Sequence, residues 1–224
     1  MRVTKTTQVT IIGVLTVTAT PSPSAGYVNT DVYVNVAWTP APSADYDITV
    51  QWGDGTTTTA ASQGSPKQVG PKRYMSPGTY NIKAIVDEPV YGYHGEATAA
   101  FQVVAQLAAA LTASPATGQA PLAVTFTMGI SDGYTPYTWA LNPGDGSTPY
   151  TGSRSSSGSF TRVHTYTKVG TFTVTLTVTD ALGASAVKRA TTSPGVIAPP
   201  TASAIGVATP LIIGTILLAA TRNR

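Results

Sequence analysis

The chain has 224 residues, a formal net charge of +3, no cysteine and only 10% charged residues. The lack of cysteine excludes disulfides and thiolate chemistry, and the thirteen Lys and Arg residues are too scattered for a nucleic-acid-binding surface. Thr often occupies every second position, which favours half-exposed β-strands. We therefore expect an all-β protein without a nucleic-acid partner.

The first eight residues are polar, and an apolar stretch with interleaved threonines follows over residues 9–20. A signal peptide is one interpretation, but the stretch is short, interrupted by Thr and without a clear cleavage site. The other interpretation, which we favour, is a first strand with Leu15, Val17 and Ala19 on one face. Secretion by an unrecognised signal stays open.

A first domain is predicted over residues 9–105. Gly53-Asp54-Gly55 directly follows Trp52 and predicts a tight turn, because Gly and Asp are typical turn residues. Apolar and β-branched runs punctuated by Gly and Pro predict the strands, which span residues 28–38, 47–52, 80–86 and 97–104.

A second domain is predicted over residues 106–191, with its own turn at Gly144-Asp145-Gly146. Residues 171–179 alternate between apolar residues and Thr, a period of two that only a strand explains. Residues 152–158 form a Ser-rich loop, and a hairpin turn begins at Asp180. Further strands are expected at 122–127, 137–141 and 184–190.

The two halves repeat one pattern. In each, a Gly-Asp-Gly turn is followed by a Tyr, a Gly-Thr step and an alternating strand, about ninety residues apart. A repeat of this kind predicts two copies of one domain. The connection near residues 105–111 is short and predicts restricted freedom between the copies, as in an end-to-end rod.

The composition changes after the second domain. A Pro-containing stem is predicted over residues 192–201, and an uncharged apolar segment over 202–221 is long enough for a transmembrane helix that places the β domains outside. The alternative is an apolar helix buried against partner subunits. The anchoring side chains would be Leu211, Ile212, Ile213, Ile216, Leu217 and Leu218.

Several blocks in order resemble the PKD (polycystic kidney disease) domain family, and the second copy is the closer match. The signature positions are Trp52, Gly53, Asp54 and Gly55 in the first copy, and Trp139, Gly144, Asp145, Gly146, His164, Tyr166 and Asp180 in the second. Asn142 and Pro143 look like two extra residues before the second turn, and Arg73 stands where the family often has His.

The resemblance implies tandem immunoglobulin-like β-sandwiches that serve adhesion, spacing or display in surface proteins of archaea, bacteria and their viruses. Modules of this family are not catalytic in themselves. In secreted hydrolases they are accessory modules, sometimes with a carbohydrate, protein or calcium contact.

The Gly-Asp-Gly turns predict structure and not chemistry. The carboxylates of Asp54 and Asp145 can accept nearby backbone N–H groups, and the glycines permit positive φ. No cluster of acids stands beside either turn to hold calcium, and the third glycine of a dinucleotide site is missing. His164 is expected to make a structural hydrogen bond. We thus expect no catalytic residue, no cofactor and no metal site.

Loop tyrosines are the candidates for contact with a glycan or protein partner, because an aromatic ring with a hydroxyl suits both. Two lie in the insertion before the last strand of the first copy, and three are expected around the second Gly-Asp-Gly turn. These residues are Tyr91, Tyr93, Tyr134, Tyr137 and Tyr150.

These features together predict a non-enzymatic, membrane-anchored surface protein that forms a rod-like projection. Two settings fit: a virion, as a spike, turret or minor structural protein, or an archaeal cell envelope. Its partners would be the membrane and other structural proteins of that assembly. A carbohydrate-binding accessory or adhesion module is the rival interpretation.

Overall fold

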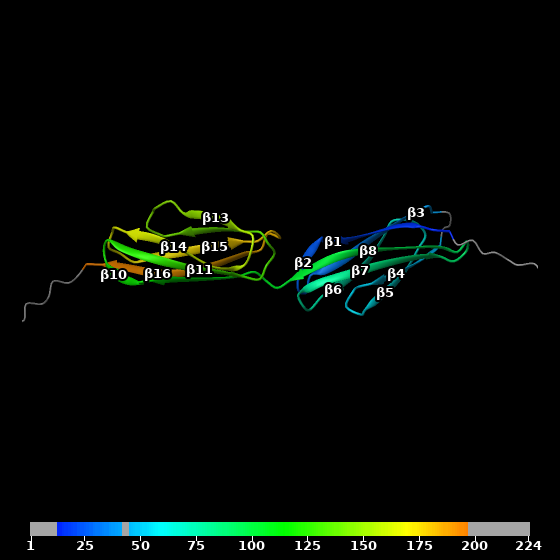
Figure 1. Ribbon diagram of the computed structural model, residues 1–224, viewed down its shortest axis with the longest axis horizontal. Helices are drawn as coiled ribbons and strands as arrows, with labels where there is room; N and C mark the ends of the chain where they lie inside the picture. The colour runs from blue at the N-terminus through cyan, green and yellow to red at the C-terminus, as the bar shows by residue number, and fades with distance from the viewer. Residues whose placement is uncertain (1–12, 42–44, 197–224) are drawn as a thin grey trace, which may run out of the picture.

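The computed structural model describes residues 13–41 and 45–196, and all regular secondary structure in these ranges is β-strand. Two sandwiches lie end to end, and the described chain starts at one end of the molecule and finishes at the other (Figure 1). The first sandwich contains β1 (Thr16–Ser22), β2 (Ala25–Tyr27), β3 (Asp31–Thr39), β4 (Tyr46–Gln51), β5 (Thr57–Ser62), β6 (Lys67–Arg73), β7 (Gly78–Glu88) and β8 (Tyr93–Val104). The second contains β9 (Ala108–Ser114), β10 (Thr117–Gln119), β11 (Leu122–Ser131), β12 (Tyr137–Asn142), β13 (Tyr150–Arg154), β14 (Gly158–Tyr166), β15 (Phe172–Thr179) and β16 (Ser185–Gly195).

The two sandwiches have the same topology. The first pairs a five-stranded sheet of order β2-β8-β7-β4-β5 with a three-stranded sheet of order β1-β3-β6. The second repeats this with β10-β16-β15-β12-β13 and β9-β11-β14. In both, the short second strand runs parallel to the last strand, while the other strand pairs are antiparallel. The predicted all-β class and the repeat of one domain are therefore confirmed over the described residues.

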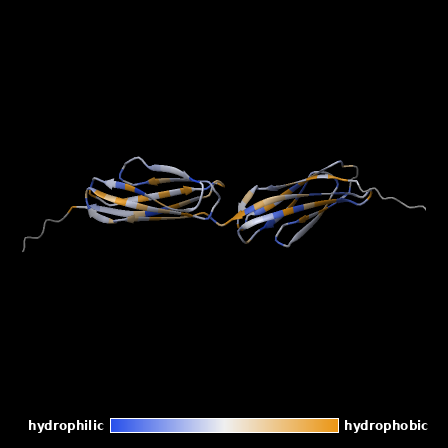
Figure 2. Cartoon of the chain, in the orientation of Figure 1, coloured by the Kyte–Doolittle hydropathy of each residue, from blue (hydrophilic) through white to orange (hydrophobic). Residues whose placement is uncertain are grey.

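Each sandwich has a separate hydrophobic core. In β15 the apolar residues Val174, Leu176 and Val178 are fully buried, and the intervening threonines face outward, as the alternation predicted. β7 does the same with Ile82, Ala84 and Val86. Figure 2 shows this alternation of hydrophobic and hydrophilic residues along the strands. Because neither core borrows residues from the other sandwich, each domain has the means to fold by itself.

Six strands were not predicted, namely β2, β5, β6, β10, β13 and β14. Most are short or lie at sheet edges, where side chains are exposed on both faces and the alternation of apolar residues is weak. The region expected to be one Ser-rich loop over 152–158 is instead the end of β13 and the start of β14, with only three residues between them.

The boundaries of the second domain shift slightly. The linker between β8 and β9 has only three residues, 105–107, and the Ala-rich stretch forms strand β9. β16 continues to Gly195, whose carbonyl accepts the Ala120 N–H at 3.0 Å, and Thr192 is buried. The first residues of the predicted stem over 192–201 therefore belong to the sandwich.

The N-terminal segment 1–8 and the apolar segment 202–221 lie outside the described residues. Across residues 13–41 and 45–196, no helix is long and apolar enough to cross a membrane.

Candidate functional site

The two Gly-Asp-Gly turns have the same backbone geometry. All four glycines have positive φ, from 78° at Gly53 to 89° at Gly146. A Cβ on Gly144 would lie 2.3 Å from the Thr173 carbonyl oxygen, and one on Gly53 would lie 2.8 Å from the backbone of Asn81. The first glycine of each turn is thus required by a close approach to the neighbouring strand as well as by φ.

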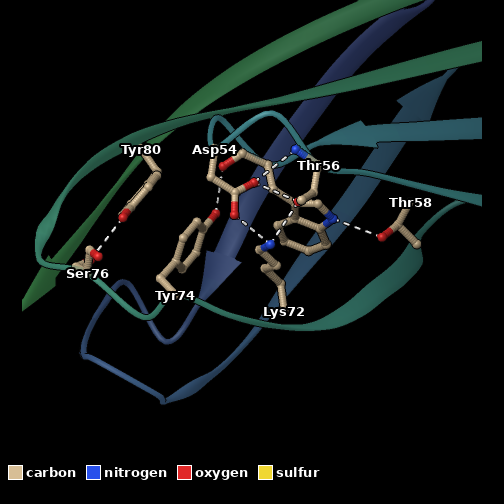
Figure 3. Close-up of polar contacts among 8 residues, drawn as sticks. Asp54, Thr56, Thr58, Lys72, Tyr74, Ser76 and Tyr80 are labelled. Atoms are coloured by element: carbon tan, nitrogen blue, oxygen red, sulfur yellow. Dashed lines mark hydrogen bonds and ion pairs between the residues drawn. The ribbon is translucent and has the colours of Figure 1, made fainter.

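Asp54 holds the first turn closed (Figure 3). Its Oδ1 accepts the Thr56 N–H at 3.1 Å and the Thr56 hydroxyl at 2.6 Å, and its Oδ2 lies 2.6 Å from Lys72 Nζ. Burial alone would raise the pKa of Asp54, but the hydrogen bonds from Lys72 and Thr56 outweigh it, so the pKa is lowered. The carboxylate therefore stays ionised and locks the turn.

Asp145 repeats this arrangement in the second domain. Its Oδ1 accepts the N–H and hydroxyl of Ser147 at 3.0 and 2.5 Å, and its Oδ2 lies 2.8 Å from His164 Nε2. The Tyr150 hydroxyl lies 3.0 Å from His164 Nδ1. Burial opposes ionisation, but bonds from Ser147 and His164 lower the pKa of Asp145 to about 2.

A buried tyrosine anchors each turn: Tyr74 directly follows β6, and Tyr166 is the last residue of β14. Tyr74 donates to the carbonyl of Trp52 at 2.8 Å, and Tyr166 donates to the carbonyl of Pro143 at 2.9 Å. Burial raises the pKa of Tyr166 to about 12, and that of Tyr74 is raised for the same reason. Both hydroxyls therefore remain donors at ordinary pH.

These contacts correct the alignment of the two copies that the sequence suggested. Trp52 is the counterpart of Pro143 and not of Trp139, which lies inside β12. Asn142 is the last residue of β12, so it is no insertion before the turn.

The residue that takes the place of His164 is Lys72 and not Arg73. Lys72 and His164 each contact the aspartate of their own turn. Arg73 instead pairs with Asp31, at 2.5 and 3.0 Å. Lys72 and Arg73 are neighbours in the sequence, so spacing alone could not show which of them is equivalent to His164. The contact between Lys72 and Asp54 shows it.

Asp180 closes the β15–β16 hairpin. It is 5% exposed, and its Oδ1 accepts the N–H groups of Leu182 and Ala184, both at 3.0 Å. Its Oδ2 accepts the Tyr134 N–H at 2.9 Å and the Tyr27 hydroxyl at 2.5 Å. In the first domain Glu88 takes the equivalent place, 1% exposed, and accepts two N–H groups of its own turn.

Two residues of these contacts, Glu88 and Tyr27, were not predicted from the sequence. Glu88 carried a signal, because it is one of two glutamates in the chain and directly ends an alternating strand, as Asp180 does. Tyr27 carried none, since its partner is 153 residues away.

The five candidate contact tyrosines do not form one cluster. Tyr91 is 60% exposed at the outer turn of the first domain, whereas Tyr93 packs partly against the first core. Tyr150 lies beside His164, with the Arg162 guanidinium 4.2 Å from its ring centroid. Tyr91 is thus the most accessible of these three rings.

Tyr134 and Tyr137 were expected near the second Gly-Asp-Gly turn, but they lie at the opposite end of β12 from it. Tyr137 is 2% exposed and donates to the Asp132 carbonyl at 2.7 Å. Burial is the main cause that raises the pKa of Tyr137, and the charges of Asp180 and Asp132 raise it further. Tyr137 is therefore closed to a partner and serves the fold.

The described part of the chain contains no group of three or more His, Asp or Glu side chains that could hold a metal ion. It has several open hollows, and one of about 400 Å³, lined by Gly53, Gly55 and Asn81, lies beside the first Gly-Asp-Gly turn. One of about 440 Å³ covers the outer face of β12 and β15, between Thr138, Ala140, Thr177 and Thr179.

Residues 108–192 match the PKD domain family, so the resemblance stated for the second copy is confirmed. No curated protein sequence matches the chain. Among solved structures, the PKD domain of human VPS10 domain-containing receptor SorCS2 is 24% identical, with 46% of this chain and 81% of that chain covered and a TM-score of 0.32.

Two further solved structures match at lower identity. Three N-terminal domains of the bacteriophage RB49 Highly Immunogenic Outer Capsid protein are 15% identical, with coverage of 82% and 70% and a TM-score of 0.45. A carbohydrate-binding module of the β-sandwich superfamily is also 15% identical, with coverage of 81% and 85% and a TM-score of 0.36.

Proposed function

We propose that this chain, whose second domain is a PKD domain, is a non-enzymatic structural protein that forms a rod-like projection from a surface. The end-to-end arrangement of two sandwiches with one topology carries this proposal. Their three-residue linker leaves little slack. Strands of nine residues span about 30 Å, so two stacked domains reach roughly 60–80 Å.

The engagement of the polar groups supports a mechanical role over a catalytic one. The aspartates of both Gly-Asp-Gly turns bind groups of their own turns, and Lys72 and His164 from the neighbouring segments bind these aspartates. Asp180 is likewise occupied by backbone donors of its hairpin. Polar groups that make these hydrogen bonds hold their own loops in place and direct no unused donor or acceptor at a substrate.

The proposal includes a membrane anchor at the C-terminus, with the β domains outside. Its support is the sequence of the tail: residues 190–221 carry no charge, and Arg222 and Arg224 follow. The setting is a virion or an archaeal cell envelope, and the partners are other structural proteins of that assembly.

The test compares the full chain with a chain that ends at Val196, after the last residue of β16. We expect the full chain to fractionate with membranes or particles and the shortened chain to be a soluble monomer. Ending at Val196 preserves the bonds of Pro194 and Gly195 to the sandwich, so loss of anchoring cannot be blamed on an unfolded domain. If both chains stay soluble and behave alike, the anchor is wrong.

A carbohydrate-binding or adhesion role is a second candidate, favoured by one observation. Tyr91 and Val90 are exposed by 60% and 65% and lie in the turn between β7 and β8. This turn is at the end of the first domain farthest from the second domain (Figure 1). We would measure glycan-array binding of the full chain and of Tyr91→Ala, with Tyr33→Ala in β3 as the control. Binding lost only in Tyr91→Ala would establish this role, and no binding by the parent would reject it.

A further inference from the structure

A hydrogen bond joins the two domains. Tyr27 ends β2 in the first domain, and its hydroxyl donates to Asp180 Oδ2 of the second domain at 2.5 Å. The backbone around Tyr27 is held in turn, because the Val28 N–H donates to the carbonyl of Val104, the last residue of β8. The contact therefore connects rigid parts of both sandwiches, at the junction seen in Figure 1.

The linker is held against the same part of the second domain. The Gly133 N–H donates to the Ala105 carbonyl at 3.1 Å. Gly133 has a φ of 71°, and a Cβ there would lie 2.8 Å from Asp180 Oδ2 and 2.9 Å from Leu107 Cδ1. Loop, linker and carboxylate are thus packed together too closely for any side chain at position 133.

The chemistry of this contact favours a strong bond. A carboxylate that is 5% exposed must be compensated by donors, and hydrogen bonds to an ionised acceptor are shorter and stronger than neutral ones. Three donors come from the second domain itself, and Tyr27 supplies the fourth from the first domain. Burial, and then the bond to Asp180, raises the pKa of Tyr27 to about 12, so its hydroxyl keeps its proton.

The other end of the molecule offers an internal comparison. Gln119 ends β10 as Tyr27 ends β2, and both strands pair in parallel with the last strand of their domain. Gln119 is exposed. The aromatic hydroxyl thus stands at the end of the domain that meets a second domain, and an ordinary surface amide stands at the end of the domain that meets the stem.

We propose that Tyr27 and Asp180 form an interdomain latch that fixes the orientation of the two domains. Domains joined by a small interface reorient by default, so a short linker alone does not make a rod stiff. This inference rests on the proposed rod and names the residues that make it rigid.

The absence of cysteine allows a direct test on the full chain. Gln68→Cys in β6 and Thr161→Cys in β14 place one spin label on an exposed strand position of each domain. The distance distribution between labels is then measured by electron double resonance in detergent, diluted with unlabelled chain. We expect one narrow distribution in this parent, and Tyr27→Phe to roughly double its width as the domains reorient.

Two more variants make the result specific. Tyr80→Phe removes a hydroxyl whose bond, to the Ser76 carbonyl at 2.9 Å, lies within the first domain, and should leave the distribution unchanged. Asp180→Asn keeps the shape of the side chain but removes the charge, and should broaden the distribution as Tyr27→Phe does. Near-ultraviolet circular dichroism checks that the domains remain folded.

The outcomes separate the latch from the rod. If the parent and Tyr27→Phe are equally narrow, the latch is wrong while the rod stands. A parent distribution that is already broad overturns both. Broadening in Tyr80→Phe as well would show a general loss of packing and would also reject the latch.

Discussion

Single carboxylates hold the ends of these sandwiches together. Asp54, Asp145, Glu88 and Asp180 each accept the backbone N–H groups of a turn, and each is more than half buried. An ionised acceptor orders a loop that has little apolar surface to bury. The chain has few charged residues, and each of these four acids has a defined structural role.

Asp145 makes the second domain sensitive to acid. Its pKa of about 2 lies below the ordinary value of 3.8, so its contribution to stability is complete above about pH 4 and disappears as the pH falls toward 2. Asp145→Asn should lower the free energy of unfolding of this domain at pH 7 by about 1–2 kcal/mol. The variant should also lose less stability between pH 4 and pH 2.

The loss of stability in Asp145→Asn can be measured by hydrogen exchange, followed on peptides from each domain. The first domain serves as the internal control. Equal protection of the second domain in the parent and in Asp145→Asn at pH 7 would contradict the role of this carboxylate.

The strands that cross the middle of each sheet were predictable from alternation. β7 and β15 alternate in sequence because one face packs on a core and the other meets water. Edge strands such as β5 and β13 carry mostly polar or small residues on both faces, so only pairing with β4 and β12 reveals them.

The turn after β12 tests how closely two elements approach. Gly144→Ala and Gly146→Ala both force Ala into positive φ, which costs about 1–2 kcal/mol. A Cβ at Gly144 would also meet the Thr173 backbone at 2.3 Å, whereas nothing lies within 4 Å at Gly146. We expect Gly144→Ala to cost at least about 3 kcal/mol and Gly146→Ala much less.

Urea unfolding of both variants gives the two free energies. If both variants lose the same free energy of unfolding, β15 moves to accommodate the added Cβ, and the close approach does not contribute to stability.

The whole molecule consists of two units with separate cores, and its stability should divide in the same way. Trp52 is 1% exposed in the first core and its indole N–H donates to the Thr58 hydroxyl at 2.9 Å. Trp52→Ala should cost the first domain about 3–5 kcal/mol and leave most of the protection of the second. In differential scanning calorimetry, the transition of the first domain should move to lower temperature while that of the second domain stays in place. A single transition that shifts as a whole would show that the two domains unfold as one unit.

The all-β class, the duplication and the identity of the turn residues were all predictable from the order of amino acids. These depend on local signals: alternation with period two, Gly and Asp at tight turns, and their recurrence after about ninety residues. The structural hydrogen bond of His164 was expected from its place in the block that resembles the PKD family, and His164 Nε2 lies 2.8 Å from Asp145 Oδ2.

The equivalence of residues in the two domains, and the contacts between distant residues, became clear from the three-dimensional fold. It paired Lys72 with Asp54, separated Tyr137 from the Gly-Asp-Gly turn, and brought Tyr27 to Asp180 across the junction. The reason is physical. The alternation that predicts a strand is a local property of the sequence. Strand register and domain contacts instead join residues that are far apart in the sequence. Their pairing depends on how the sheets pack and how the two sandwiches meet.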